Sequence, residues 1–135
     1  MNRWLFKTEP SCYSFAHLAR DKRTRWDGVA NAVALKHLRS IAKGDLVLIY
    51  HTGDEKAVVG VAEAVSDAYP DPKAKDDRAA VVDIEAKHAL PRPVTLAELK
   101  ARTDLATFPL VRLPRLSVMP VQATEWKVIE RLARA

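Results

Sequence analysis

The sequence predicts an α+β fold in which one compact, strongly bent or barrel-like sheet has short helices at its ends. Short segments of strand length recur along the chain, and the helical segments between them follow no strict strand–helix alternation. The 135 residues are 48% hydrophobic, which is enough for one core and too few for two, and no internal repeat is present. We therefore expect a single domain spanning residues 1–135, with about five strands and about four short helices.

The first part of the chain predicts a strand followed by two small helices. Residues 4–8 are rich in aromatic side chains and precede a Glu-Pro pair, which is typical of a strand and its end. Ser11 and Ser14 are both placed to cap a short helix. The charged run at residues 20–25 breaks the apolar pattern as a loop would. After an Asp-Gly turn, Asn31 can cap a second helix that ends near residues 43–44.

The middle of the chain predicts a hairpin. Residues 46–51 form a continuous apolar run that is typical of a buried strand, and residues 57–65 return as a second strand after a polar loop. Gly60 lies inside the second strand and predicts a bulge or a close approach of another group to the backbone. The polar stretch at residues 69–78 predicts an exposed loop.

The last part predicts two strands and two helices. Residues 80–86 alternate like a strand with one solvent-facing side, and the Pro-Arg-Pro sequence at 91–93 is expected to end it. Residues 95–98 have the pattern of a capping box at the start of a short helix. After a turn-rich connector, residues 115–118 predict a short strand, and Thr124 can cap a final helix.

Charge and cysteine content indicate the partners and the compartment. The chain has 22 Lys and Arg against 17 Asp and Glu, a net charge of +5 and a pI near 9.5, which favours polyanionic partners such as nucleic acids. The single cysteine, Cys12, cannot form an internal disulfide or by itself a structural zinc site, so we expect a reducing compartment, the cytoplasm. We expect no signal peptide and no membrane span, because no apolar run approaches ~20 residues.

Signatures of catalysis are few. The sequence contains no phosphate-binding glycine loop and no zinc motif. Cys12 and His17 lie near each other in the sequence, but nothing local indicates an activated thiol. His51 with Asp54 and Glu55 could form an acid–base site. A small hydrolase or nucleic-acid-modifying enzyme therefore stays open as the alternative to a non-enzymatic binding module, and a protein-interaction module is a third hypothesis.

Several segments follow one another in the order and spacing of a known protein family. On these segments the chain resembles the EVE domain family of the PUA-like superfamily, which includes the thymocyte nuclear proteins and many small bacterial proteins. The resemblance covers nearly the whole chain. The segments that carry it are residues 4–10 with Tyr13 and Ser14, residues 26–31, residues 44–45 with 50–52, residues 69–72, residues 93–96 and residues 115–121.

The resemblance implies a single EVE domain over residues 1–135, with a PUA-like mixed pseudo-barrel of five or six strands. It also implies a pocket, aromatic and polar, that accepts a flipped, modified base of DNA or RNA and needs no metal and no cofactor. We expect a non-enzymatic module that is a monomer. The chain departs from the family pattern at two positions. Ala30 stands where the family commonly has Arg, and Thr52 where it often has Ser. The first change removes a planar, permanently charged donor.

The candidate ligand-binding residues combine an aromatic plane with polar groups. An isolated base loses its stacking, and aromatic planes restore about 1–3 kcal/mol per base. Trp26 is the candidate plane because it lies beside a turn, and packing at a helix–sheet junction is its alternative role. Asn31 could read a base edge or only cap its helix. Tyr50, His51 and Thr52 end a buried strand, a rigid support for binding groups.

Four further residues are candidate ligand contacts, each with a structural alternative. Lys7 could contact a phosphate or only be solvated, and Ser14 could donate to a ligand or only cap a helix. Arg115 and Ser117 could likewise contact a ligand or have only a structural role. Beside Trp26, a basic group predicts contacts with the nucleic-acid backbone, with a solvated loop as the alternative. Its members are Lys22, Arg23 and Arg25.

Overall fold

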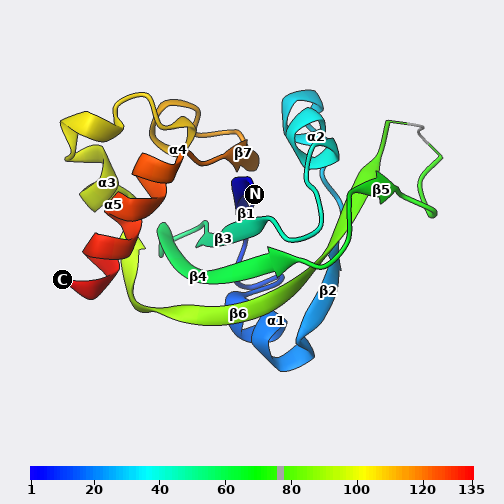
Figure 1. Cartoon of the computed structure of the whole chain (residues 1–135), viewed down its shortest axis with the longest axis horizontal. Coiled ribbons are helices and arrows are strands. Elements are labelled where there is room, and N and C mark those ends of the chain that lie inside the picture. The colour runs from blue at the N-terminus through cyan, green and yellow to red at the C-terminus, as the bar shows by residue number, and fades with distance from the viewer. Residues whose placement is uncertain (76–77) are drawn as a thin grey trace.

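The computed structural model describes residues 1–75 and 78–135, whose strands form one curled sheet (Figure 1). Six strands are hydrogen-bonded in the order β2-β6-β4-β3-β1-β7, and the short β5 pairs with β6. The sheet closes only part of a barrel, so the prediction of an α+β fold with a bent sheet of five or six strands is confirmed. The strands are β1 (Arg3–Thr8), β2 (Arg23–Trp26), β3 (Leu46–His51), β4 (Ala57–Ala64), β5 (Tyr69–Pro70), β6 (Ala80–Thr95) and β7 (Val118–Pro120).

Short helices cover the ends and edges of this sheet. The first helix contacts β2 and β6, the second contacts β6 and β7, and the C-terminal helix packs on β6. Figure 1 shows the last three helices gathered on one side of the sheet. Within the described residues no helix is long and apolar enough to cross a membrane. The helices are α1 (Phe15–Asp21), α2 (Ala32–Arg39), α3 (Leu96–Lys100), α4 (Pro109–Arg112) and α5 (Ala123–Arg134), with a short 3-10 helix at Thr103–Leu105.

The pairing of β1 with β3 brings two loops together. These strands are parallel, and their register places Thr8 opposite His51 at the same end of the sheet. The Thr52 amide then donates to the Thr8 carbonyl at 2.9 Å. The loops that follow β1 and β3 therefore leave the sheet side by side.

A buried carboxylate fixes the other end of this strand pair. Asp45, just before β3, is 3% exposed and accepts hydrogen bonds from the Trp4 indole at 2.9 Å and from the Asn2 and Ala42 amides at 3.0 Å each. Burial alone raises the pKa of Asp45, but these hydrogen bonds outweigh it and hold the pKa below its usual range.

The charged run at residues 20–25 is divided between the end of α1 and the strand β2, so the expectation of a loop there was wrong. Residues 23–26 pair antiparallel with β6. Arg23 and Arg25 are exposed while Thr24 is half-buried and Trp26 is buried. This alternation has the period of a strand with one solvent-facing side, and the high charge of its outer positions masked it.

The expected end of a strand at residues 91–93 was also wrong, because β6 continues through both prolines to Thr95. The pairing with β4 jumps from Gly60 opposite Ala89 to Val58 opposite Val94. The prolines lie in the bulged stretch between these pairs, where β6 has more residues than β4. Their missing N–H groups therefore cost no ladder hydrogen bond.

Of the two serines expected to cap the first helix, Ser14 does so and Ser11 does not. The expected caps at Asn31 and Thr95 are confirmed by their side-chain hydrogen bonds to the first turn of each helix. The end of the second helix was placed too late. It ends at Arg39, and Gly44, with a φ of 97°, then forms the turn into β3.

Three boundaries in the remainder differ from expectation. Tyr69–Pro70 forms β5 instead of a loop, and residues 76–77 of that predicted loop lie outside the described residues. The final strand begins at Val118, because a turn from Leu113 to Leu116 occupies the preceding backbone. The final helix is capped at Gln122 and not at Thr124. The backbone amide of Gln122 donates to the Glu125 side chain at 2.8 Å.

The expectation for Gly60 is confirmed. The register between β4 and β6 shifts next to it, and a Cβ atom built there would lie 2.5 Å from the ring of Phe15. Only glycine lets α1 approach β4 this closely.

Candidate functional site

A concave pocket of about 500 Å³ opens where the ends of β1 and β2 meet the segments that follow them. We call it the Trp26 pocket. Its walls combine aromatic, charged, hydroxyl and small side chains. They are Lys7, Thr8, Glu9, Tyr13, Thr24, Arg25, Trp26, Asp27, Gly28, Val29, Ala30 and Ser117.

Trp26 packs in the core and also lines the Trp26 pocket. Its side chain packs against Phe6 with the ring centroids 5.2 Å apart, and Tyr13 meets it edge-on at 6.3 Å. Only 9% of the residue is exposed, so the indole belongs to the core. The same residue lines the pocket, and a ring held by two aromatic neighbours is a rigid surface for a ligand to contact.

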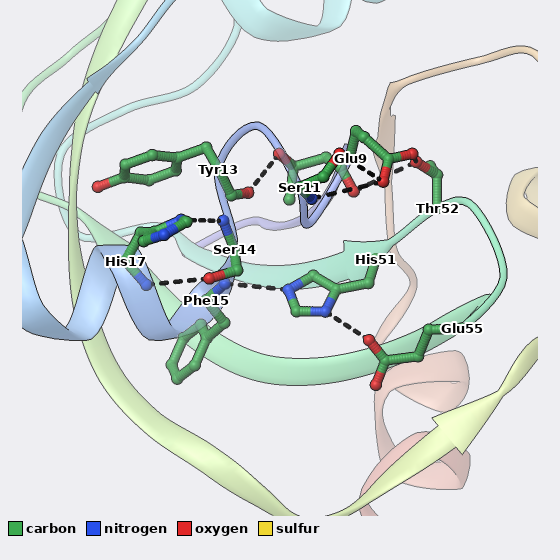
Figure 2. A network of polar contacts seen from close by, with 10 residues as sticks. Glu9, Ser11, Tyr13, Ser14, Phe15, His17, His51, Thr52 and Glu55 are labelled. Atoms are coloured by element: carbon green, nitrogen blue, oxygen red, sulfur yellow. Dashed lines mark hydrogen bonds and ion pairs between the residues drawn. The ribbon is translucent and has the colours of Figure 1, made fainter.

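Glu9 gives the pocket a fixed carboxylate (Figure 2). One oxygen accepts from the Ser11 hydroxyl at 3.2 Å, and the other accepts from the Thr52 hydroxyl at 3.2 Å. Gly53 has a φ of 77°, and a Cβ atom there would lie 3.1 Å from the Glu9 carboxylate. The loops after β1 and β3 thus hold an acceptor group at the pocket wall. A carboxylate that is already oriented needs little reorganisation when a ligand binds.

The loop between Glu9 and α1 is held by local hydrogen bonds. The Thr8 hydroxyl donates to the Tyr13 carbonyl at 2.6 Å, and the Tyr13 hydroxyl donates to Asp21 at 2.9 Å. Ser14 and His17 form a reciprocal capping box, which Figure 2 shows. Ser14 is thereby committed to the helix start and does not line the Trp26 pocket.

His51 holds the end of this loop, where α1 begins. Its Nε2 atom accepts a hydrogen bond from the Phe15 amide at 3.0 Å, and its Nδ1 atom lies 2.7 Å from Glu55 (Figure 2). An Nε2 atom that accepts carries no proton, so Nδ1 carries it and donates to Glu55. Both ring nitrogens are occupied and the residue is 7% exposed. The geometry therefore gives His51 the task of fixing the start of α1.

Tyr50 and Thr52 line a separate hollow of about 320 Å³, which shares Lys7 with the Trp26 pocket. The Lys7 ammonium donates to the Pro114 carbonyl at 2.8 Å and lies 5.7 Å from the centre of the Tyr50 ring. Burial lowers the pKa of Lys7 and raises the pKa of Tyr50. Tyr50 is thus a buried neighbour of Lys7 and lies outside the Trp26 pocket.

The candidates near α2 divide between two sites. Ser117 lines the Trp26 pocket, whereas Asn31 and Arg115 line an adjacent apolar hollow. The Asn31 side-chain oxygen accepts from the amides of Val33 and Ala34, both at 3.0 Å. This cap occupies the carbonyl that would read a base edge.

Of the three basic candidates, only Arg25 lines the Trp26 pocket. Arg25 lines the pocket, and its Nε atom donates to the Tyr69 hydroxyl at 3.0 Å. Arg23 makes an exposed ion pair with Glu85 at 3.4 Å. Lys22 is exposed and ends α1 in a left-handed conformation with a φ of 68°. The alternation of β2 thus places Arg23 and Arg25 on the outer side of the sheet.

Sequence reasoning did not select several residues of the Trp26 pocket. In the sequence, Glu9 was interpreted as the end of a strand, and Asp27 and Val29 as parts of a turn. The signal that could have found Glu9 is its place after a parallel strand pair, but that pairing is not visible in one sequence. Among the described residues, no group of three or more His, Cys, Asp or Glu side chains could hold a metal ion.

Comparisons with known proteins agree on the family. The EVE domain model matches residues 2–132. Rat thymocyte nuclear protein 1 is 30% identical over 99% of this chain and 74% of its own length. A Rhodopseudomonas palustris protein solved by NMR is 38% identical with a TM-score of 0.93, covering 99% of this chain and 94% of that one. Human THYN1, solved in complex with DNA containing 5-methylcytosine, is 27% identical with a TM-score of 0.89, covering 100% of this chain and 99% of that one. The chain therefore belongs to the EVE domain family.

Proposed function

We propose that this protein binds a modified base of DNA, 5-methylcytosine or a close analogue, in the Trp26 pocket without chemically changing it. The observation that carries the proposal is the combination in one pocket of a rigid aromatic residue, Trp26, with the carboxylates of Glu9 and Asp27. A volume of about 500 Å³ lies within the range of small-ligand sites. The complex of human THYN1 with 5-methylcytosine DNA supports this choice of base.

The pocket offers a partner for each part of the base. The exocyclic amine of cytosine is a donor that carboxylates recognise, and Glu9 and Asp27 supply carboxylates. The hydroxyl of Ser117 can donate to the ring acceptors. Val29 provides apolar surface for a 5-methyl group, in the way that apolar side chains contact the methyl of thymine.

The basic groups around the pocket would contact phosphates. Arg25 lines the pocket, Lys22 and Arg23 are exposed three and two residues before it in the chain, and the net charge is +5. Such contacts add affinity and salt dependence without base preference.

The enzymatic alternative is not favoured. Its best candidate base, His51, uses Nε2 to accept from the Phe15 amide and lines neither the Trp26 pocket nor the Tyr50 hollow. An exposed free thiol at Cys12 suits a reducing compartment, so we include the cytoplasm in the proposal.

The test compares duplex oligonucleotides that differ only in a central cytosine or 5-methylcytosine, using fluorescence anisotropy. We expect preferential binding of the methylated duplex, with the oligonucleotide recovered unchanged by mass spectrometry. Glu9→Gln should weaken this binding by about 1–3 kcal/mol, because it replaces a carboxylate by an amide whose NH₂ cannot accept. The matched control is Glu130→Gln on α5, which should bind like wild type. Equal affinity for both duplexes, or equal losses in the two variants, would contradict the proposal.

A further inference from the structure

Two large apolar side chains are exposed beside each other next to the Trp26 pocket. Val33 is 51% exposed and Leu113 is 39% exposed, and among the large hydrophobic residues described only Met1 exceeds them. Both line a shallow hollow of about 350 Å³ together with Pro114 and Leu116. We call Val33 and Leu113 with this hollow the Val33–Leu113 patch.

Neither side chain is needed by the core. On α2 the buried positions are Ala34, Leu35 and Leu38, so Val33 lies off the core-facing side of the helix. Leu113 follows α4, whose buried residue is Leu110. Contiguous exposed apolar surface rimmed by polar residues is typical of interaction sites, and Asn31 and Arg115 border this hollow.

The patch and the Trp26 pocket are built from the same two segments. Ala30 lines the pocket and Asn31 and Val33 line the patch, so the chain passes directly from one to the other. On the second segment, Ser117 lines the pocket and Arg115 lines the patch. The pocket and the patch therefore adjoin each other along both segments.

We propose that Val33 and Leu113 form an apolar wedge that enters the base stack of duplex DNA beside the base held in the Trp26 pocket. This inference rests on the proposed function. A base that leaves the duplex opens a gap in the stack, and apolar side chains inserted at a base step compensate for the lost stacking.

Charge and size favour DNA as the occupant over a second protein. Arg115 borders the patch, is exposed, and has no hydrogen bond or ion pair within residues 1–75 and 78–135, so its charge is available to a phosphate. A stable protein interface buries about 800 Å² on each partner, far more than two side chains provide. A base step needs only a small apolar insertion.

The experiment uses the full chain with Val33→Ser and Leu113→Ser combined. The control combines Val33→Ile with Leu113→Met, which keeps the patch apolar. Each protein is titrated with a 5-methylcytosine oligonucleotide, both single-stranded and as a duplex with 2-aminopurine next to the modified base. We expect the serine variant to lose about tenfold or more in duplex affinity, because unstacking a step costs a few kcal/mol. It should also lose the rise in 2-aminopurine fluorescence, while its single-strand affinity and the control variant stay at the wild-type level.

Other outcomes overturn the proposal. Unchanged duplex affinity in the serine variant, or an equal loss for single strand and duplex, would mean that the patch is no wedge. A concentration-dependent dimer of the wild type that the serine variant loses, with duplex binding intact, would assign the patch to a second copy of the chain. If the wild type binds the methylated single strand but leaves 2-aminopurine quenched in the duplex, only the wedge fails. If it binds neither oligonucleotide, the proposed function fails and the wedge with it.

Discussion

Replacing Trp26 by alanine tests whether one residue serves the core and the pocket together. The indole is 9% exposed, and its centroid lies 5.2 Å from that of Phe6 and 6.3 Å from that of Tyr13. Removing it leaves a cavity beside both rings, and Trp→Ala changes in cores cost about 3–5 kcal/mol. Total stabilities of domains are about 5–15 kcal/mol, so Trp26→Ala should be strongly destabilised and can be partly unfolded.

Trp26→Phe separates the two roles because it keeps an aromatic ring against Phe6. We expect a smaller loss of unfolding free energy than for the alanine variant, measured by denaturant titration followed by circular dichroism. Affinity for the methylated duplex should still fall, since the smaller ring presents less stacking surface and base–aromatic stacking supplies about 1–3 kcal/mol. Anisotropy is measured well below the unfolding midpoint, so that only folded protein is compared.

The matched control is Trp126→Phe. Trp126, on α5, is similarly buried at 7% exposure, but it lines a different hollow between α5 and the sheet. If both Trp→Phe variants lose the same base affinity, the loss reflects stability and Trp26 is no part of the binding surface. If Trp26→Ala loses less than about 1 kcal/mol, below the range for core positions, the packing argument is refuted.

Three further changes test the framework behind the pocket. Gly60→Ala should cost about 1–3 kcal/mol, because its Cβ would lie 2.5 Å from the Phe15 ring, and a wild-type denaturation midpoint would contradict this. His51→Ala leaves the Phe15 amide without its acceptor and should cost about 1–3 kcal/mol, seen also as faster hydrogen exchange at that amide; unchanged exchange would refute the assigned support role. The Arg92 guanidinium and the amide of the capping box lower the pKa of Glu98 from 4.5 to about 2. Because the folded pKa lies below the unfolded one, the carboxylate stabilises the fold above pH 4.5 and loses this effect as the pH falls through 2. Glu98→Gln should therefore be about 1 kcal/mol less stable than wild type at pH 7, a value reduced for solvent screening, and the difference should vanish near pH 2.

Local signals in the sequence predicted local structure well. The caps at Ser14, Asn31 and Thr95 depend on hydrogen bonds within one turn of the chain, so the sequence contains all that they require. The course of β6 through two prolines could not be predicted in the same way. It depends on how many residues of β4 lie opposite, which is a property of two strands together.

The pocket was predicted only in part, for the same reason. Trp26, Lys7 and Ser117 were selected individually and lie in one pocket because the curled sheet brings β2, β1 and the start of β7 together. Glu9 was overlooked because its partner Thr52 reaches it only through the parallel pairing of β1 with β3. Asn31 was selected because its side chain can read a base edge. In the structure its side-chain oxygen instead accepts from the first turn of α2.

The last prediction concerns Ala30, a small residue that lines the Trp26 pocket together with Arg25. The residue is exposed and precedes α2, so a long side chain there displaces no core group. Ala30→Arg should raise affinity for the methylated duplex and steepen the dependence of log K on log salt by about 0.9, the effect of one added phosphate contact. Ala30→Gln adds a long polar side chain without charge and should leave the salt slope unchanged. If the arginine and glutamine variants gain equally, or if the arginine variant loses preference for the methylated base, the added side chain acts inside the pocket. The view of this position as a backbone contact at the pocket mouth would then be wrong.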